Sequence, residues 1–190
     1  MTRVTLATVA LIAAAASLML VIAAHIARPD IPVLTSVVSQ YAVGPFGWIQ
    51  ALVFATLAAS CLALFLVLLG VKLSVGGRIG SWLLLAASAG LALAAAFPLG
   101  QPLHEVASMI GNLSLPVAML LVGLALKPRS PGQLVLSHLP WIGVVLMMST
   151  LFLLPGVVGL ANRFVVLAYI VWLLVVSRRL RATSAEDAAR

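Results

Sequence analysis

The chain has 190 residues, of which 64% are hydrophobic and 8% are charged. A soluble domain carries about 25% charged residues, so a soluble globular fold is excluded. The net charge is +7 and there is one cysteine, Cys61, which excludes an intrachain disulfide and a cysteine-rich metal site. The basic residues lie at the ends of apolar runs, where they suit anionic lipid headgroups, and no nucleic-acid partner is expected.

Apolar runs of about 20 residues or more follow one another along the chain, and about 20 helical residues span the ~30 Å hydrocarbon core of a membrane. Helices are expected because the polar–apolar alternation that is typical of a membrane barrel is absent. The six runs cover about 4–27, 47–71, 79–99, 103–126, 138–158 and 159–180.

These runs predict an all-α fold, an integral membrane bundle of six transmembrane helices in a single domain, 1–181. The longest connection, 28–46, ends in the turn-forming Gly44-Pro45-Phe46, and we expect it to form a re-entrant or surface-lying segment. The polar tail, 182–190, is expected to be disordered. Small residues of the third run, such as Gly90, favour a close approach of helices.

Basic residues are divided unequally between the two sides of the predicted bundle. Arg28 and Arg163 fall on one side, and nine others fall on the side of the N-terminus. Because Lys and Arg accumulate in cytoplasmic loops, the N- and C-termini are both expected in the cytoplasm. The nine are Arg3, Lys72, Arg78, Lys127, Arg129, Arg178, Arg179, Arg181 and Arg190.

Most other polar residues collect on the extracytoplasmic side. Charges near lipid are costly unless they pair or face water, so partners are expected within this group. Arg163 with Glu105 is the preferred pair, and Asp30 is the competitor. The alternative for each residue is a solvated structural role at headgroup level. The candidate ligand-binding residues are His25, Asp30, Gln40, Tyr41, His104, Glu105, Ser108, Asn112 and Arg163.

The fourth run carries a polar stripe on one helical face, formed by His104, Ser108, Gly111, Asn112 and Leu115. Pro116 has no N–H, so the carbonyl of Asn112 loses its usual helical partner. A polar groove that ends at such a carbonyl suits a headgroup, a file of waters or a small polar solute. In the alternative, Ser108 and Asn112 simply bond a neighbouring helix.

Histidines raise two sharper alternatives for a cofactor. A haem could be held by His25 and His104, or a zinc ion by the same pair and a carboxylate. His138 falls on the cytoplasmic side, and an interfacial histidine usually bonds a backbone group or a headgroup. No cofactor and no metal are therefore expected.

Three motifs resemble those of a known family. They are Ser39-Gln40-Tyr41-Ala42-Val43-Gly44-Pro45-Phe46-Gly47-Trp48, then Phe97-Pro98 followed by Leu103-His104, and finally Asn162-Arg163 with Trp172 and Arg178-Arg179-Leu180. They are similar to the loop before span two, the junction of spans three and four, and the last span of bacterial proteins described as "domain of unknown function 998".

The resemblance covers nearly the whole chain and implies a six-span bundle in the bacterial cytoplasmic (inner) membrane. It favours the region of Tyr41, His104 and Arg163 for whatever site exists. The family often has a Thr-Asp step after Phe-Pro, whereas this chain has Leu99-Gly100-Gln101. An activity that depended on that acid would be absent here or would use Glu105.

The leading hypothesis is a non-enzymatic membrane protein that binds or moves a lipid or small amphiphile through an extracytoplasmic-facing polar pocket. One alternative is an intramembrane lipid-modifying enzyme with His104 as general base and Glu105 or Asp30 orienting it. Another is a scaffold subunit of a membrane complex. No Ser-His-Asp spacing or multi-histidine motif supports catalysis, so an enzyme is not favoured. Membrane lipids are the expected partners.

Overall fold

The computed structural model describes residues 1–97, 99–128 and 130–188. The long helices are α1 (Arg3–Ala27), α2 (Gly47–Leu68), α3 (Val75–Ala96), α4 (Pro102–Ala125), α5 (Pro131–Leu153) and α6 (Val158–Ala188), with short 3-10 turns at η1 (Val38–Ala42) and η2 (Pro155–Val157). The described residues contain six helices long and apolar enough to cross a membrane. The prediction of an all-α, multi-pass membrane bundle is confirmed.

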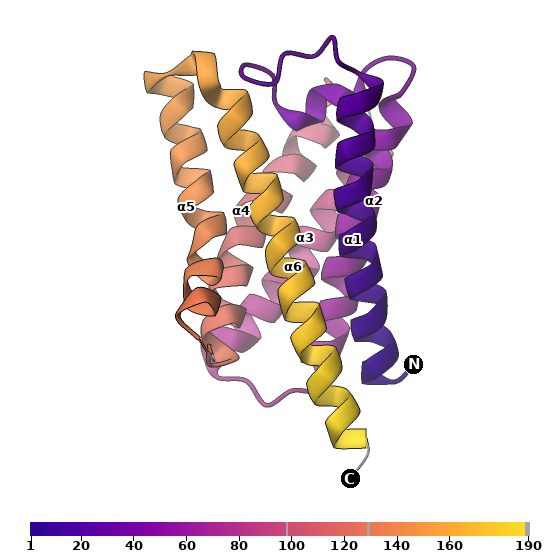
Figure 1. The fold of residues 1–190 in the computed structure, drawn as a ribbon, viewed down its shortest axis with the longest axis vertical. Helices are drawn as coiled ribbons and strands as arrows, with labels where there is room; N and C mark the ends of the chain where they lie inside the picture. The colour runs from indigo at the N-terminus through magenta and orange to yellow at the C-terminus, as the bar shows by residue number, and fades with distance from the viewer. Residues whose placement is uncertain (98, 129, 189–190) are drawn as a thin grey trace.

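The helices form a ring in chain order. Each helix packs on the next along the chain, and α6 closes the ring by packing on α1 (Figure 1). The start of α1 and the end of α6 lie at the same end of the bundle, which we call the terminal end. The opposite end carries η1 and the turns that precede α4 and α6, and we call it the loop end.

Small residues let α1 pack closely on α2. Ala7, Ala10 and Ala14 are wholly buried, at the spacings of three and four that define one helical face. The seam is joined by two hydroxyl bonds: Ser60 Oγ donates to the carbonyl of Ala10 at 2.9 Å, and Ser17 Oγ lies 2.8 Å from Thr56 Oγ1. Between helices in a membrane such contacts replace the hydrophobic drive, because lipid is as apolar as the helix surface.

Glycine allows a similar approach between α3 and α4. A Cβ atom added to Gly90 would lie 2.7 Å from the carbonyl oxygen of Ala107 and 2.8 Å from the backbone nitrogen of Gly111. Both distances are shorter than van der Waals contact, and both neighbours are backbone atoms that cannot rotate away. The expected close approach at Gly90 is therefore present.

The connection 28–46 folds onto the loop end instead of hanging free. Its side chains Ile31, Val38 and Tyr41 are buried in an apolar cluster with Ala24 of α1 and Ile49 of α2. The backbone nitrogens that begin α6 are satisfied by the same loop, since Gly159 N donates to the carbonyl of Leu34 at 2.7 Å. The loop is thus a covering layer that fixes where α6 begins.

Two predicted spans begin too late. The third helix starts at Val75 and not at 79, and the fifth starts at Pro131 and not at 138. A serine side chain caps the start of each helix. Ser74 Oγ accepts a hydrogen bond from the backbone nitrogen of Gly77, and Ser130 Oγ accepts one from the backbone nitrogen of Gln133. The prediction was made from the length of apolar runs, and it therefore left out the less apolar first turns of these two helices.

The last helix runs further than the sixth apolar run. α6 continues as helix to Ala188, beyond the boundary expected at 181. Thr183 Oγ1 bonds back to the carbonyl of Arg179 at 3.0 Å, and alanines in this stretch favour helix.

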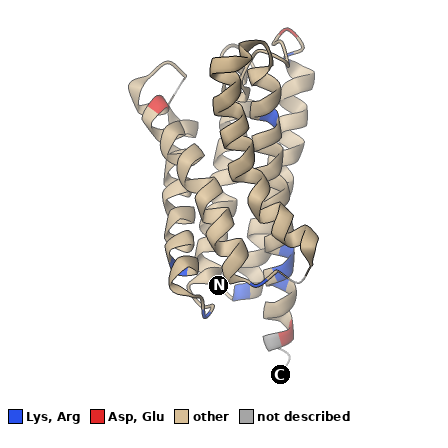
Figure 2. Cartoon of the chain, turned by 90° about the vertical axis from the view of Figure 1, so that its left-hand side faces the viewer, with Lys and Arg blue, Asp and Glu red and all other residues tan. Residues whose placement is uncertain are grey.

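Lys and Arg gather at the terminal end, as Figure 2 shows. Two of the basic residues that were assigned to this side, Arg129 and Arg190, lie outside the described residues, as does Pro98 of the family motif.

The approach at Gly90 yields a stability test. Gly90→Ala should lower the unfolding free energy by about 1–3 kcal/mol, because the added methyl pushes two backbones apart. Gly76→Ala, on the same helix, is the matched control, because its Cβ would meet only Leu121 Cδ2 at 3.9 Å. Thermal unfolding in detergent measures the difference, and equal melting temperatures would contradict the packing of α3 on α4.

Candidate functional site

Arg163, near the start of α6, is the centre of a hydrogen-bonded group that joins α1, η1 and α6. Its Nε donates to His25 Nε2 at 2.8 Å, and its Nη2 donates to Tyr41 Oη at 3.0 Å. The Tyr41 ring lies 4.7 Å from the His25 ring and 5.6 Å from the guanidinium carbon, centroid distances that allow ring and cation–π contact. Three residues far apart in the sequence therefore meet at one point.

The covering loop supplies the other partners of Arg163. Nη1 donates to the carbonyl oxygens of Val33 at 2.8 Å and Ser36 at 2.6 Å, and to that of Gly159 at 3.0 Å. A Cβ atom on Gly159 would lie 2.6 Å from the same two loop carbonyls, so glycine is what lets the loop come this close. The guanidinium thus ties the loop to α6.

His25 has a defined arrangement of its ring hydrogen. Its Nδ1 lies 2.8 Å from the carbonyl oxygen of Val21, which only accepts hydrogen bonds. Its Nε2 faces Arg163 Nε, which only donates. The hydrogen therefore sits on Nδ1, and Nε2 serves as acceptor for the arginine.

The expected pairing of Arg163 with Glu105 or Asp30 is wrong. No carboxylate lies within ion-pair distance of Arg163 in the part of the chain that the structure describes. Asp30 instead accepts from Nε and Nη2 of Arg28 at 2.9 and 2.8 Å. Glu105 is exposed in the first turn of α4, where a negative side chain suits the helix dipole. The groups that accept hydrogen bonds from Arg163 are the His25 ring, the Tyr41 hydroxyl and three carbonyl oxygens, and none of them is a carboxylate that would compensate its charge.

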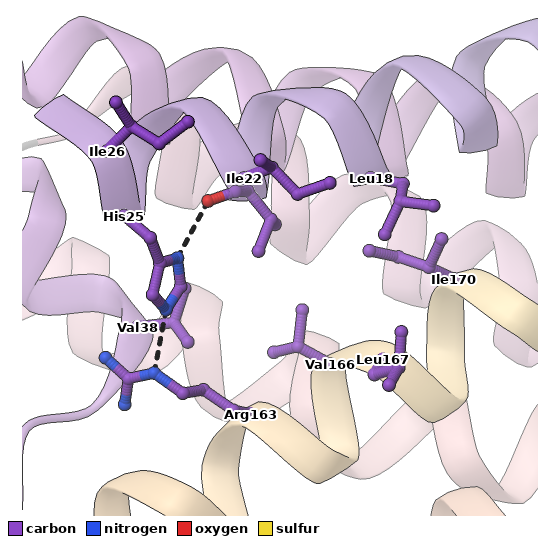
Figure 3. A pocket seen from close by; sticks show the side chains of 10 residues that line it. Leu18, Ile22, His25, Ile26, Val38, Arg163, Val166, Leu167 and Ile170 are labelled. Carbon is purple, nitrogen blue, oxygen red and sulfur yellow. Dashed lines mark hydrogen bonds between the residues drawn. The ribbon is translucent and has the colours of Figure 1, made fainter. Parts of the chain in front are cut away.

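A groove of about 440 Å³ runs between α1 and α6 from this cation. Figure 3 shows His25 and Arg163 bonded across one end of it, with Leu18 and Ile170 at the other end. Apart from that polar pair, every lining side chain is aliphatic. The lining residues are Leu18, Val21, Ile22, His25, Ile26, Val38, Arg163, Val166, Leu167 and Ile170.

A smaller cavity of about 80 Å³ shares Val38 and Val166 with the groove. The predicted polar stripe of α4 contributes Ser108 and Asn112 to its wall, so the single pocket expected from the sequence is divided into two hollows. The remaining lining residues are Ser39, Gln50, Val53, Phe54, Leu57, Leu91, Ala94 and Asn162. Gln50 and Asn162 were not among the candidates, although a glutamine within an apolar run is a signal that could have found the first.

The freed carbonyl of Asn112 has a partner of its own. Tyr169 Oη donates to it at 3.4 Å from α6, one turn before Pro116 interrupts the bonding pattern of α4. Part of the stripe therefore bonds a neighbouring helix, as the structural alternative proposed.

His104 and Gln40 line neither hollow. His104 is buried, with Nδ1 3.1 Å from the carbonyl oxygen of Ala94 and 2.9 Å from that of Phe97, so it holds the end of α3. Gln40 is exposed on η1. Within the described residues, no group of three or more His, Cys, Asp or Glu side chains could hold a metal ion.

The bonds from Arg163 predict an effect on the covering loop. Arg163→Lys keeps the charge but cannot reproduce the Nε and paired Nη donors, so hydrogen exchange across 28–46 should accelerate at least about ten-fold. Arg78→Lys, exposed at the terminal end, is the matched control and should leave exchange unchanged. Hydrogen exchange of residues 28–46 is measured by mass spectrometry. Unaltered protection in Arg163→Lys would show that the loop is held by its apolar contacts alone.

The Arg28–Asp30 pair predicts a pH effect. Hydrogen bonding to Arg28 lowers the pKa of the Asp30 carboxyl below its ordinary value. The pair is therefore formed above the ordinary pKa and is lost as pH falls through the lowered one. A carboxyl NMR titration of Asp30 should give a depressed midpoint that rises in Arg28→Gln. A midpoint that is the same in both proteins would contradict the pairing.

The whole chain can be compared with known proteins. A family model, described as "Protein of unknown function (DUF998)", matches residues 11–179. No curated protein and no solved structure matches the chain closely enough to indicate a relationship. The family match covers α2 to α5, most of α1 and α6, and every residue that lines the two hollows, and it agrees with the resemblance of the three motifs. The chain belongs to the DUF998 family of multi-pass membrane proteins.

Proposed function

We propose that this protein binds an anionic amphiphile, a lipid or a lipid-like molecule, in the groove between α1 and α6. The chain of the ligand lies along the aliphatic walls, and its acidic headgroup lies at Arg163. The observation that carries this proposal is a cation at the end of an apolar groove, with no carboxylate in ion-pair distance among the described residues.

The size and lining of the groove suit such a ligand. Small-molecule sites have volumes of about 300–1,000 Å³ with mostly apolar walls and a few placed polar groups. The groove has about 440 Å³, and only His25 and Arg163 among its lining side chains are polar. Chain burial gains little in a membrane, however, because the lipid that it leaves is equally apolar. Selectivity must therefore come from the polar end.

Arg163 can supply that selectivity. Nη2 uses one N–H for Tyr41, and its second N–H has no protein partner in the described chain. The guanidinium is already held by His25 and the loop carbonyls, so little side-chain freedom is lost when a headgroup binds. Charge-assisted hydrogen bonds contribute about 1.5–3 kcal/mol, which corresponds to about ten-fold preference or more for an acidic headgroup.

The distribution of basic residues supports an orientation for this site. Lys and Arg gather at the terminal end, and the positive-inside rule would place that end in the cytoplasm. The headgroup end of the groove would then face the extracytoplasmic side. With the motifs that resemble bacterial proteins, this favours the bacterial inner membrane. Catalysis by His104 is not favoured, because its ring is buried and lines neither hollow.

The test compares lipids on purified protein by native mass spectrometry. Wild type should retain phosphatidylglycerol about ten-fold better than phosphatidylcholine. Leu167→Trp adds bulk to the groove wall and keeps the Arg163 side chain, and it should lose retention of both lipids. Arg163→Gln should lose the preference.

Leu66→Trp, at an exposed position on α2, is the control for the added bulk and should behave as wild type. Hydrogen exchange across 28–46 must be normal in Leu167→Trp, which separates loss of the ligand from loss of the loop. Equal retention of the two lipids by wild type, or identical behaviour of the two tryptophan variants, would refute the proposal.

A further inference from the structure

The cavity that lies beside the groove contains an unusual side chain, Gln50 in the first turn of α2. Gln50 is 1% exposed, and neither its Oε1 nor its Nε2 has a hydrogen-bond partner within the described protein. Two other buried polar residues, Ser60 and Ser88, are bonded to carbonyl oxygens at 2.9 Å. Burying an amide group without hydrogen-bond partners is energetically costly, so something other than protein is expected to bond it.

The walls around Gln50 specify what that partner can be. Two hydroxyls and two carboxamides share the cavity with it, those of Ser39, Ser108, Asn112 and Asn162, and no charged side chain is among the lining residues. A charged ligand would therefore be left without a counter-charge in a low-dielectric site. Hydroxyl and amide groups both donate and accept, and they complement a neutral ligand that does the same.

One wall of the cavity is held in place by a hydrogen bond. Asn162 Oδ1 accepts from the backbone nitrogen of Val38 at 2.8 Å, which holds η1 in place beside the cavity. His104 lies nearby, with its ring 6.0 Å from that of the lining residue Phe54. Its Nδ1 faces two carbonyls and carries the hydrogen, which leaves Nε2 as a second buried acceptor without a partner. Among the residues that line the cavity, Gln50 is the one whose buried side-chain atoms lack a hydrogen-bond partner within the described protein.

The volume limits the ligand to a few atoms. Water occupies about 30 Å³ per molecule in the liquid, so about 80 Å³ holds two or three waters or one compound of similar size. Cavities that stay empty are apolar, and this one is polar on several sides. A dry cavity would leave both atoms of Gln50 unsatisfied.

We propose that this cavity is a binding site for a small uncharged ligand that both donates and accepts hydrogen bonds, with the Gln50 carboxamide as its anchor. The ligand is a cluster of two or three waters or an amide or alcohol of that size. The site is separate from the groove, and the proposal stands whether or not the groove binds a lipid.

Gln50→Met gives the first test, because methionine nearly preserves shape and removes both polar atoms. If a ligand bonds Gln50, this variant loses those bonds and its melting temperature should fall by about 2–4 °C. If the cavity is dry, removing two unsatisfied atoms should raise the melting temperature. Gln40→Met, at an exposed position that lines neither hollow, is the matched control.

The second test uses wild-type protein and identifies the ligand, so it does not depend on the folding of a variant. Water-edited solid-state NMR with ¹⁵N-labelled glutamine should show transfer from water to the Gln50 side chain. Acetamide is then added. Loss of that transfer, together with protection of the wild-type protein against heat, would assign an amide-type solute. Persistent transfer without protection would assign resident water. The proposal would be overturned if the melting temperature of Gln50→Met did not fall below that of wild type. It would also be overturned if wild type showed neither transfer from water nor protection by acetamide.

Discussion

The loop end of this bundle depends on one guanidinium, that of Arg163, whose charge is balanced by no carboxylate among the described residues. Arg163 donates to His25, to Tyr41 and to backbone carbonyls, which fixes a covering loop over the start of α6. Carbonyl dipoles can saturate N–H groups, but they do not neutralise a cation. In a low-dielectric setting the remaining charge favours an anion nearby. Structure and proposed binding thus follow from the same side chain, since the bonds that immobilise Arg163 also prepare it for a headgroup.

Two neighbouring residues of α6 serve two different hollows. Arg163 closes the apolar groove beside α1, whereas Asn162 lines the polar cavity and bonds the backbone of Val38. Successive residues of a helix are rotated by about 100°, so two consecutive side chains can point into two different sites. Val38 and Val166 line both hollows and form the partition between them. A charged, apolar-walled groove and an uncharged, polar cavity therefore share a common wall.

Apolar length was enough to predict the helices, because few structures other than a membrane-spanning helix tolerate 20 such residues in succession. It failed at Val75 and Pro131, where polar first turns are stabilised by serine caps. Topology also predicted that His25, Tyr41 and Arg163 share an end of the bundle. It could not predict that loop carbonyls, and not Glu105, would be the partners of Arg163. Every residue has a backbone carbonyl, so the sequence does not indicate which of them accept hydrogen bonds from a given side chain. The carbonyl freed by Pro116 was predicted, and the helix that bonds it became known only from the packing of Tyr169.

The most direct measurement is anomalous diffraction from crystals grown with phosphatidylglycerol that carries bromine on its acyl chain. The account predicts a bromine peak between Leu18 and Leu167, and a headgroup phosphate within hydrogen-bond distance of Arg163 Nη2. A groove filled equally by detergent or by a neutral lipid, with no acidic group at Arg163, would contradict it. In that case the role of Arg163 would be limited to holding the covering loop in place by hydrogen bonds.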